Sequence, residues 1–76
     1  MGYKVASIIG KGNLKPYSQT VSLPDPVPVS CLPELIKLPD IYRENIIAVR
    51  DGKVLSLDEL LYEDDEIIIF MSVMGG

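Results

Sequence analysis

The sequence predicts a small α+β domain, with a mixed sheet of four to five strands and one main short helix packed on one face. Its 76 residues are 47% hydrophobic, which suits a single folded globule, and the apolar residues come in runs of strand length. Two hairpin signals flank one segment of helical spacing, and a continuous apolar run lies close to the end of the sequence. Two hairpins joined through a helix account for this order.

The first hairpin is predicted close to the start of the sequence. Residues 3–9 alternate as a half-buried strand, with Ala6 and Ile8 sharing one face. The glycines and asparagine of residues 10–13 suit a tight reversal, because these residue types tolerate positive φ. We therefore expect residues 14–23 to return as an antiparallel second strand.

A stiff crossing and a short helix follow this hairpin. Three prolines in residues 24–29 lack backbone donors and favour extended geometry, which excludes a helix there. Ser30 is the predicted helix N-cap, Pro33 fits the first turn, and Pro39 ends the helix. Apolar residues at helical spacing mark its buried side: Leu32, Leu35, Ile36 and Leu38. A helix of about two turns must be stabilised by packing against the sheet.

The second hairpin is predicted at Asp51-Gly52, a pair that strongly favours a two-residue turn. The β-branched run of residues 45–50 forms the strand before it, and residues 53–55 form a short strand after it. Residues 56–61 are expected to form a helical turn or an irregular crossing, because they begin with a capping-box spacing. An acidic turn at residues 63–65 then leads into the last strand.

The last strand is apolar on both faces, as a central strand is when one face is core and the other meets a partner. Because strand side chains alternate, Ile67 and Ile69 are assigned to the helix-covered core. Ile68 and Phe70 are assigned to the open face. Two residues of the neighbouring strand are expected to add to that open face: Ile46 and Ala48.

Composition argues against several classes of function. The formal net charge is −4, and six of the acidic residues lie within residues 58–66, where they would repel a nucleic-acid backbone. The chain has no histidine, and the single cysteine, Cys31, cannot hold a metal alone, so no metal site and no ordinary catalytic machinery is expected. Cys31 is interpreted as a small packed residue. No apolar run suits a membrane span or a signal peptide, so a cytoplasmic protein is expected.

The sequence closes on Gly75-Gly76 directly after an apolar run. Glycine makes up about 7% of average sequences, so two closing glycines arise by chance in about one chain in two hundred. Residues without Cβ form a thin thread that can enter a narrow channel and adopt any φ/ψ it requires. The carboxylate of Gly76 is ionised near neutral pH and is a poor electrophile, so it requires activation. We expect the usable chemistry of the chain to lie in this carboxylate.

From Leu61 to Gly76 the chain resembles the β-grasp, ubiquitin-like sulfur carriers, the family of the molybdopterin synthase small subunit (MoaD) and the thiamine-biosynthesis sulfur carrier (ThiS). Those carriers have an acidic Gly-Asp-Glu turn, an apolar strand reaching a phenylalanine, a short segment with a valine, and Gly-Gly. The corresponding residues here are 64–66, 67–70, 71–74 and 75–76, without a gap. Residues 47–53 are similar to the third strand and turn of the family.

The chain departs from the family pattern at several positions. Asp64 stands where a glycine is usual, and Arg50 stands where an asparagine is common. Met71 and Ser72 stand where the molybdopterin carriers tend to have prolines. These departures leave open whether the pathway is molybdopterin, thiamine or another sulfur-transfer route.

The resemblance implies a β-grasp domain over residues 1–74 with a flexible diglycine tail at residues 75–76. It implies a carrier rather than an enzyme: an ATP-dependent, ubiquitin-activating-type enzyme adenylates Gly76, and sulfur from a donor displaces AMP. The thiocarboxylate then serves an acceptor such as the molybdopterin synthase large subunit or a thiazole synthase. No cofactor is bound by the carrier itself. Gly75 belongs with Gly76 to the reacting tail, and the partner-binding residues implied are Ile68, Phe70, Met71, Val73 and Met74.

Two alternatives share these residues. A ubiquitin-like modifier would undergo the same activation but would end in an isopeptide bond between Gly76 and a partner lysine. A non-conjugating interaction domain would carry the two glycines only as a frayed end, because the last residues of most domains are poorly ordered.

Overall fold

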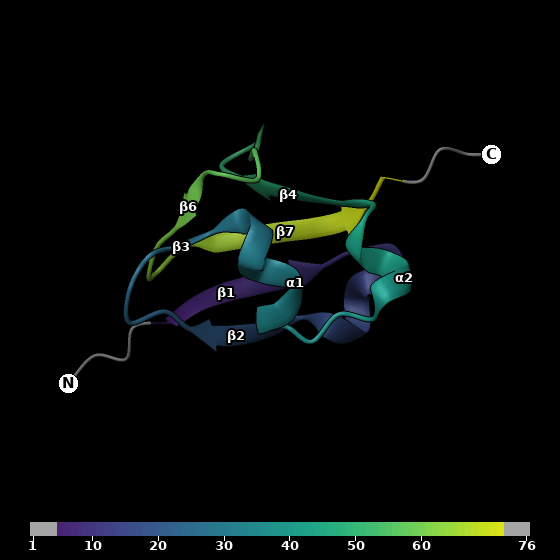
Figure 1. Cartoon of the computed structure of the whole chain (residues 1–76), viewed down its shortest axis with the longest axis horizontal. Helices are drawn as coiled ribbons and strands as arrows, with labels where there is room; N and C mark the ends of the chain where they lie inside the picture. Colours follow the sequence, from purple (N-terminus) through teal and green to yellow (C-terminus); the bar gives the residue numbers. More distant parts are fainter. Residues whose placement is uncertain (1–4, 73–76) are drawn as a thin grey trace.

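The computed structural model describes residues 5–72 and confirms the predicted fold class, a small α+β domain built on a mixed five-stranded sheet (Figure 1). The sheet strands are β1 (Val5–Gly10), β2 (Gln19–Ser22), β4 (Ile46–Arg50), β5 (Lys53–Val54) and β7 (Glu66–Met71). A separate two-stranded sheet is formed by β3 (Val27–Pro28) and β6 (Leu60–Leu61). The helical segments are two 3₁₀ helices, η1 (Gly12–Tyr17) and η2 (Val29–Cys31), and two short α-helices, α1 (Leu32–Leu35) and α2 (Asp40–Arg43).

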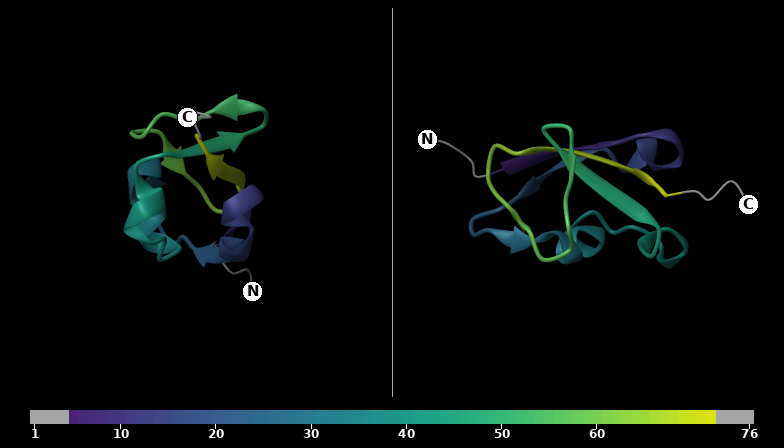
Figure 2. Two further views of the ribbon diagram at one scale, coloured as in Figure 1. Left: turned by 90° about the vertical axis from the view of Figure 1, so that its right-hand side faces the viewer. Right: turned by 90° about the horizontal axis from the view of Figure 1, so that it is seen from above.

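The order of the main sheet is β2-β1-β7-β4-β5, with β7 at its centre. β7 runs parallel to β1 and antiparallel to β4. The two short α-helices lie on one side of this sheet (Figure 2). The order is consistent with a β-grasp-like fold, and the central place of β7 explains why its residues are apolar on both faces.

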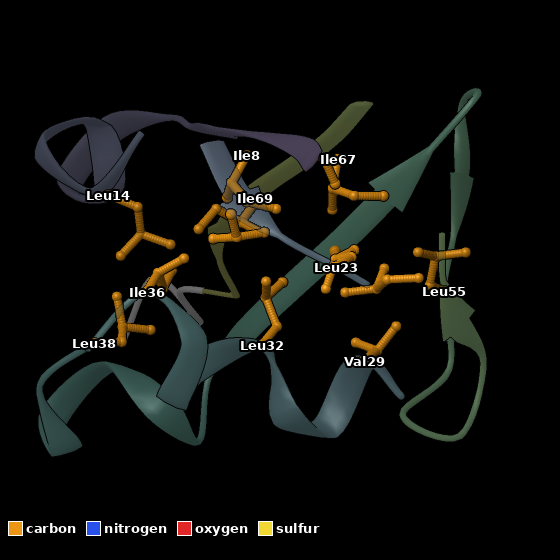
Figure 3. Packing of buried hydrophobic residues seen from close by; sticks show 14 residues of the cluster. Ile8, Leu14, Leu23, Val29, Leu32, Ile36, Leu38, Leu55, Ile67 and Ile69 are labelled. Atoms are coloured by element: carbon orange, nitrogen blue, oxygen red, sulfur yellow. The ribbon is translucent and has the colours of Figure 1, made fainter. Parts of the chain in front are cut away.

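The hydrophobic core lies between the sheet and the helical layer (Figure 3). Ile67 and Ile69 are fully buried, as predicted, and so are Ala6 and Ile8 on the neighbouring strand. The predicted helix residues face them from the other layer: Leu32, Ile36 and Leu38 are buried, and Leu35 packs against the cluster. Burying a side chain of this size stabilises the fold by about 1.5–3 kcal/mol.

The second half of the first hairpin differs from the prediction of one strand over residues 14–23. Gly12–Tyr17 form the 3₁₀ helix η1, and only Gln19–Ser22 pair with β1. Gly12 begins the helix with φ +57°, and the turn carries the fully buried Leu14 into the core. A single buried leucine therefore outweighs the strand propensity around it.

The predicted helix also begins differently. Ser30 is not its N-cap, because η2 carries the chain from Val29 to Cys31 and leads directly into α1. Cys31 takes the capping position without a side-chain hydrogen bond, whereas Pro33 lies in the first turn as predicted. A second short helix, α2, follows Pro39 and was not predicted. None of the helices within residues 5–72 is long and apolar enough to cross a membrane.

The capping-box residues make their expected bond outside a helix. The Ser56 backbone N–H donates to Glu59 Oε2 at 2.8 Å, and the Glu59 N–H donates to the Ser56 carbonyl at 3.1 Å. The chain then enters β6, which pairs antiparallel with β3. The irregular crossing was therefore predicted correctly at its start, but its last two residues form a strand.

The two turns predicted at residues 51–52 and 63–65 are present in the structure. Asp51 and Gly52 have φ of +54° and +78°, which is the geometry of the predicted two-residue hairpin turn. Asp64 has φ +69°, so this aspartate adopts the left-handed conformation for which glycine is best suited. The sequence resemblance places a glycine of the sulfur carriers at this position, and here the chain adopts a positive φ.

Substituting Asp64 by valine is expected to lower the free energy of unfolding, whereas glycine should be tolerated. A β-branched side chain in the left-handed region is penalised by about 1–2 kcal/mol. Urea denaturation of the two variants measures the difference, and Glu63→Val is the matched control, because Glu63 is an exposed neighbour with ordinary φ. Equal stabilities of the Asp64→Val and Glu63→Val variants would contradict the positive φ.

Candidate functional site

The face of the sheet opposite the helices carries an apolar surface, which we call the open-face patch. On β7, Ile68 and Phe70 alternate with the buried Ile67 and Ile69, so they point away from the core and are half-buried. Pairing between strands brings further residues to the same side. The patch consists of Ile9 on β1, Ile47 and Val49 on β4, Val54 on β5, and Ile68 and Phe70 on β7.

The register of β4 against β7 decides which residues of β4 belong to the patch. Ile47 lies opposite Phe70, and Val49 lies opposite Ile68. The expectation that Ile46 and Ala48 contribute to the open face is wrong, because Ala48 is buried and Ile46 packs against the core. A shift of register by one residue exchanges the two faces of a strand, and the sequence of β4 is apolar on both.

The patch residues that the sequence did not single out are Ile9, Ile47, Val49 and Val54. Val54 is 66% exposed, which is high for a large apolar side chain. Its cross-strand partner is Val49, so the short β5 extends the patch by one residue. The predicted hairpin turn could have revealed this pair, because a two-residue turn at 51–52 places Val49 opposite Val54.

Met71 lies on the other side of β7 from Phe70. It is half-buried and packs against the core cluster, so it is not part of the open-face patch. Met71 and Phe70 nevertheless meet at the end of β7, where they line a shallow hollow of about 260 Å³ with Lys11, Gly12 and Asn13 of the first hairpin. The hollow places a lysine beside the point where β7 ends.

The remaining predicted site residues lie outside the described residues: Val73, Met74, Gly75 and Gly76. The chain leads towards them from a fixed position, since Ser72 continues the pairing with β4 by donating its N–H to the Asn45 carbonyl. Phe70 and the hollow lie at this same end of the sheet. The predicted boundary between residues 74 and 75 also falls outside the described part.

The opposite end of β7 is held by an ion pair. Arg50 donates to Asp65 Oδ2 at 2.8 Å and to the Leu60 carbonyl at 3.0 Å, and Asp65 Oδ2 also accepts the Tyr62 N–H at 2.9 Å. Both charged side chains are about four-fifths buried, so the pair is less screened than a surface salt bridge. Arg50 thus links β4, β6 and the acidic turn.

The rest of the acidic run lies exposed around this ion pair. Because β4 is antiparallel to β7, the Asp51 turn lies at the same end as the start of β7. Glu63, Asp64 and Glu66 are exposed there. The negative charge therefore gathers at the end of the sheet remote from Ser72, where it can orient the domain towards a basic partner surface.

Other chemistry-bearing groups do not assemble into a site within residues 5–72. No three histidine, cysteine, aspartate or glutamate residues in this part of the chain could hold a metal ion. Cys31 is a half-buried free thiol at the start of α1. Three features lie along β7: the open-face patch, the hollow beside Met71, and the strand end that precedes residues 73–76. Neither protein-family models nor curated proteins match this chain.

Proposed function

We propose that the protein is a cytoplasmic sulfur carrier that acts through the carboxylate of Gly76. The observation that carries this proposal is the position of β7: the central strand ends at Met71, next to half-buried Phe70, and Ser72 still pairs with β4 before the last residues of the sequence. An apolar surface and a reactive tail at one end of a small domain suit a protein that is held and processed by larger enzymes.

In the proposed reaction the Gly76 carboxylate attacks the α-phosphate of ATP on an activating enzyme and releases pyrophosphate. A sulfide-level donor then attacks the acyl-adenylate carbonyl, AMP leaves, and a thiocarboxylate remains on Gly76. The thiocarboxylate sulfur is finally transferred to an acceptor of the molybdopterin or thiamine type. The activation step is required because a carboxylate alone is a poor electrophile.

The open-face patch supports the docking part of this proposal. Isolated surface hydrophobics are ordinary, but Ile9, Ile68 and Phe70 are contiguous across the parallel strands β1 and β7, and β4 adds two more apolar residues to the same face. The β2 edge of this face is polar, with Thr20 and Ser22 exposed. An apolar centre beside a polar edge is the usual composition of a protein interface.

Replacing Phe70 by glutamate should weaken docking to the activating enzyme while the fold persists. Loss of a central aromatic contact typically costs about 2 kcal/mol of binding, so kcat/KM for adenylation should fall about thirtyfold. ATP–pyrophosphate exchange with the purified adenylating enzyme of the same cells measures this change. Stability should change modestly, because Phe70 is only half-buried.

Thr20→Glu is the matched control, because it places the same charge on the polar edge of the same face. Adenylation of this variant should be close to that of the unaltered protein. A large drop in melting temperature for Phe70→Glu, or unchanged adenylation by it, would show that the open-face patch is not the docking surface.

A further inference from the structure

A groove of about 600 Å³ lies on the other side of β4, between the strand and the helical layer. One wall consists of η2 and α1, and the other consists of β4 and the segment after β5. Val29, Ala48 and Leu55 form its apolar floor, and Leu57 stands on its rim with 67% of its surface exposed. The groove adjoins the open-face patch at Ile47 and Val54 but faces the helices.

One end of the groove is closed by backbone hydrogen bonds. The Val29 N–H donates to the Glu59 carbonyl at 2.8 Å, and the Ser30 N–H donates to the Leu57 carbonyl at 3.0 Å. These bonds tie the segment after β5 to η2. Glu44, at the C-terminal end of α2, also lines the groove.

Within residues 5–72, the edge of β4 that lines the groove is paired over only part of its length. β5 pairs with β4 only at Val49 and Arg50, and the Leu55 N–H adds one more bond, to the Ala48 carbonyl at 2.8 Å. This bond shows that the polar groups of Ala48 point away from β7. Because the direction alternates along an antiparallel strand, the N–H and C=O of Ile46 point the same way, and β5 is too short to reach them.

The charges around the groove have one dominant sign. Its charged lining residues are Glu34, Arg43 and Glu44. The Arg43 Nε–H donates to the Leu38 carbonyl at 2.8 Å and lies 3.5 Å from Asp40 Oδ1, so a third carboxylate partly offsets the charge of this cation. The two glutamates are exposed. An occupant with basic residues at its ends therefore fits the rim.

We propose that this groove binds an extended segment of a partner protein, with apolar side chains at its centre and lysine or arginine beside them, which adds as a short strand to this edge of β4. Main-chain bonds to Ile46 would supply affinity, and the apolar floor and Glu34 and Glu44 would select the side chains. The site is independent of Gly76, so it would serve a carrier, a modifier or an interaction domain equally.

The test uses the ¹⁵N-labelled full chain and two synthetic probes capped at both ends. The basic peptide is Lys-Val-Ile-Val-Lys, and the acidic peptide is Glu-Val-Ile-Val-Glu. Titration with the basic peptide should shift the amide signals of Ile46, Ala48 and Leu57, and its affinity should exceed that of the acidic peptide by about tenfold. Shifts centred on Ile68 and Phe70 instead would overturn the proposal.

Charge-reversal variants test whether Glu34 and Glu44 produce the preference for the basic peptide. The double variant Glu34→Lys, Glu44→Lys should prefer the acidic peptide. The double variant Glu63→Lys, Glu66→Lys has the same net charge but alters the opposite end of the sheet, so it should keep the preference for the basic peptide. If both double variants lost that preference equally, overall charge rather than the groove would be responsible, and the proposal would be wrong.

A third probe tests the strand pairing itself. Replacing the central isoleucine of the basic peptide by proline keeps both lysines but removes a backbone donor and hinders pairing with a neighbouring strand. Its affinity should fall about tenfold. Equal binding of the proline peptide would show that the groove does not extend the sheet.

Discussion

Substituting Gly75 by valine is expected to reduce adenylation of Gly76 about a hundredfold, because a Cβ and two methyl groups obstruct the narrow channel that must bring the carboxylate to ATP. The melting temperature should remain nearly unchanged, since the core described for residues 5–72 already extends from Ala6 to Ile69. ATP–pyrophosphate exchange and thermal unfolding measure the two effects separately.

Two control variants test whether the size of the side chain at position 75 limits adenylation. Gly75→Ala adds only one carbon, so its adenylation should lie between that of the valine variant and that of the unaltered protein. Deletion of Gly76 should abolish adenylation at the normal position altogether. Normal adenylation of the valine variant would contradict the narrow channel, and normal cellular activity after deletion of both glycines would favour an interaction domain.

Substituting Gly10 by alanine is expected to have the largest effect on stability among the single changes considered. A Cβ on Gly10 would lie 1.9 Å from the Leu14 carbonyl oxygen and 2.5 Å from its carbon. Backbone cannot move aside as a side chain can, so overpacking should lower the free energy of unfolding by about 3 kcal/mol. That is a large part of the total stability of a domain of this size.

Gly12→Ala is the matched control for this change. Gly12 has φ +57°, and nothing lies within 4 Å of a Cβ added there, so only the penalty of the left-handed conformation applies, about 1 kcal/mol. Urea denaturation of both variants measures the difference. A Gly10→Ala variant as stable as Gly12→Ala would contradict the close contact between η1 and the end of β1.

The sequence predicted best where local chemistry and burial agree. Asp51-Gly52 specifies its turn by positive φ alone, and the alternation of residues 67–70 separates core from open face because Ile67 and Ile69 face the helical layer. Pro33 likewise fits the first helical turn in any context. Each of these features depends on residues within a few positions of one another.

The features that the sequence did not predict depend on contacts distant in the chain. The register that turns Ile47 and Val49 to the open face is set by pairing with β7, about twenty residues away. Leu14 interrupts the predicted strand with its side chain buried in the core, and β6 pairs with β3, which is more than thirty residues away in the sequence. The short strand β5 was predicted, but the groove behind β4 was not, because its other wall is formed by η2 and α1, which are distant from β4 in the sequence.

The most direct test of the proposed carrier is the intact mass of the protein purified from its own cells without reducing or acidic treatment, followed by mass analysis of its C-terminal peptide. The proposal predicts a fraction heavier by the difference between sulfur and oxygen, located at Gly76. An unmodified C-terminus together with conjugates that disappear when Gly76 is deleted would contradict the carrier and identify a modifier. An unmodified C-terminus without conjugates would contradict both.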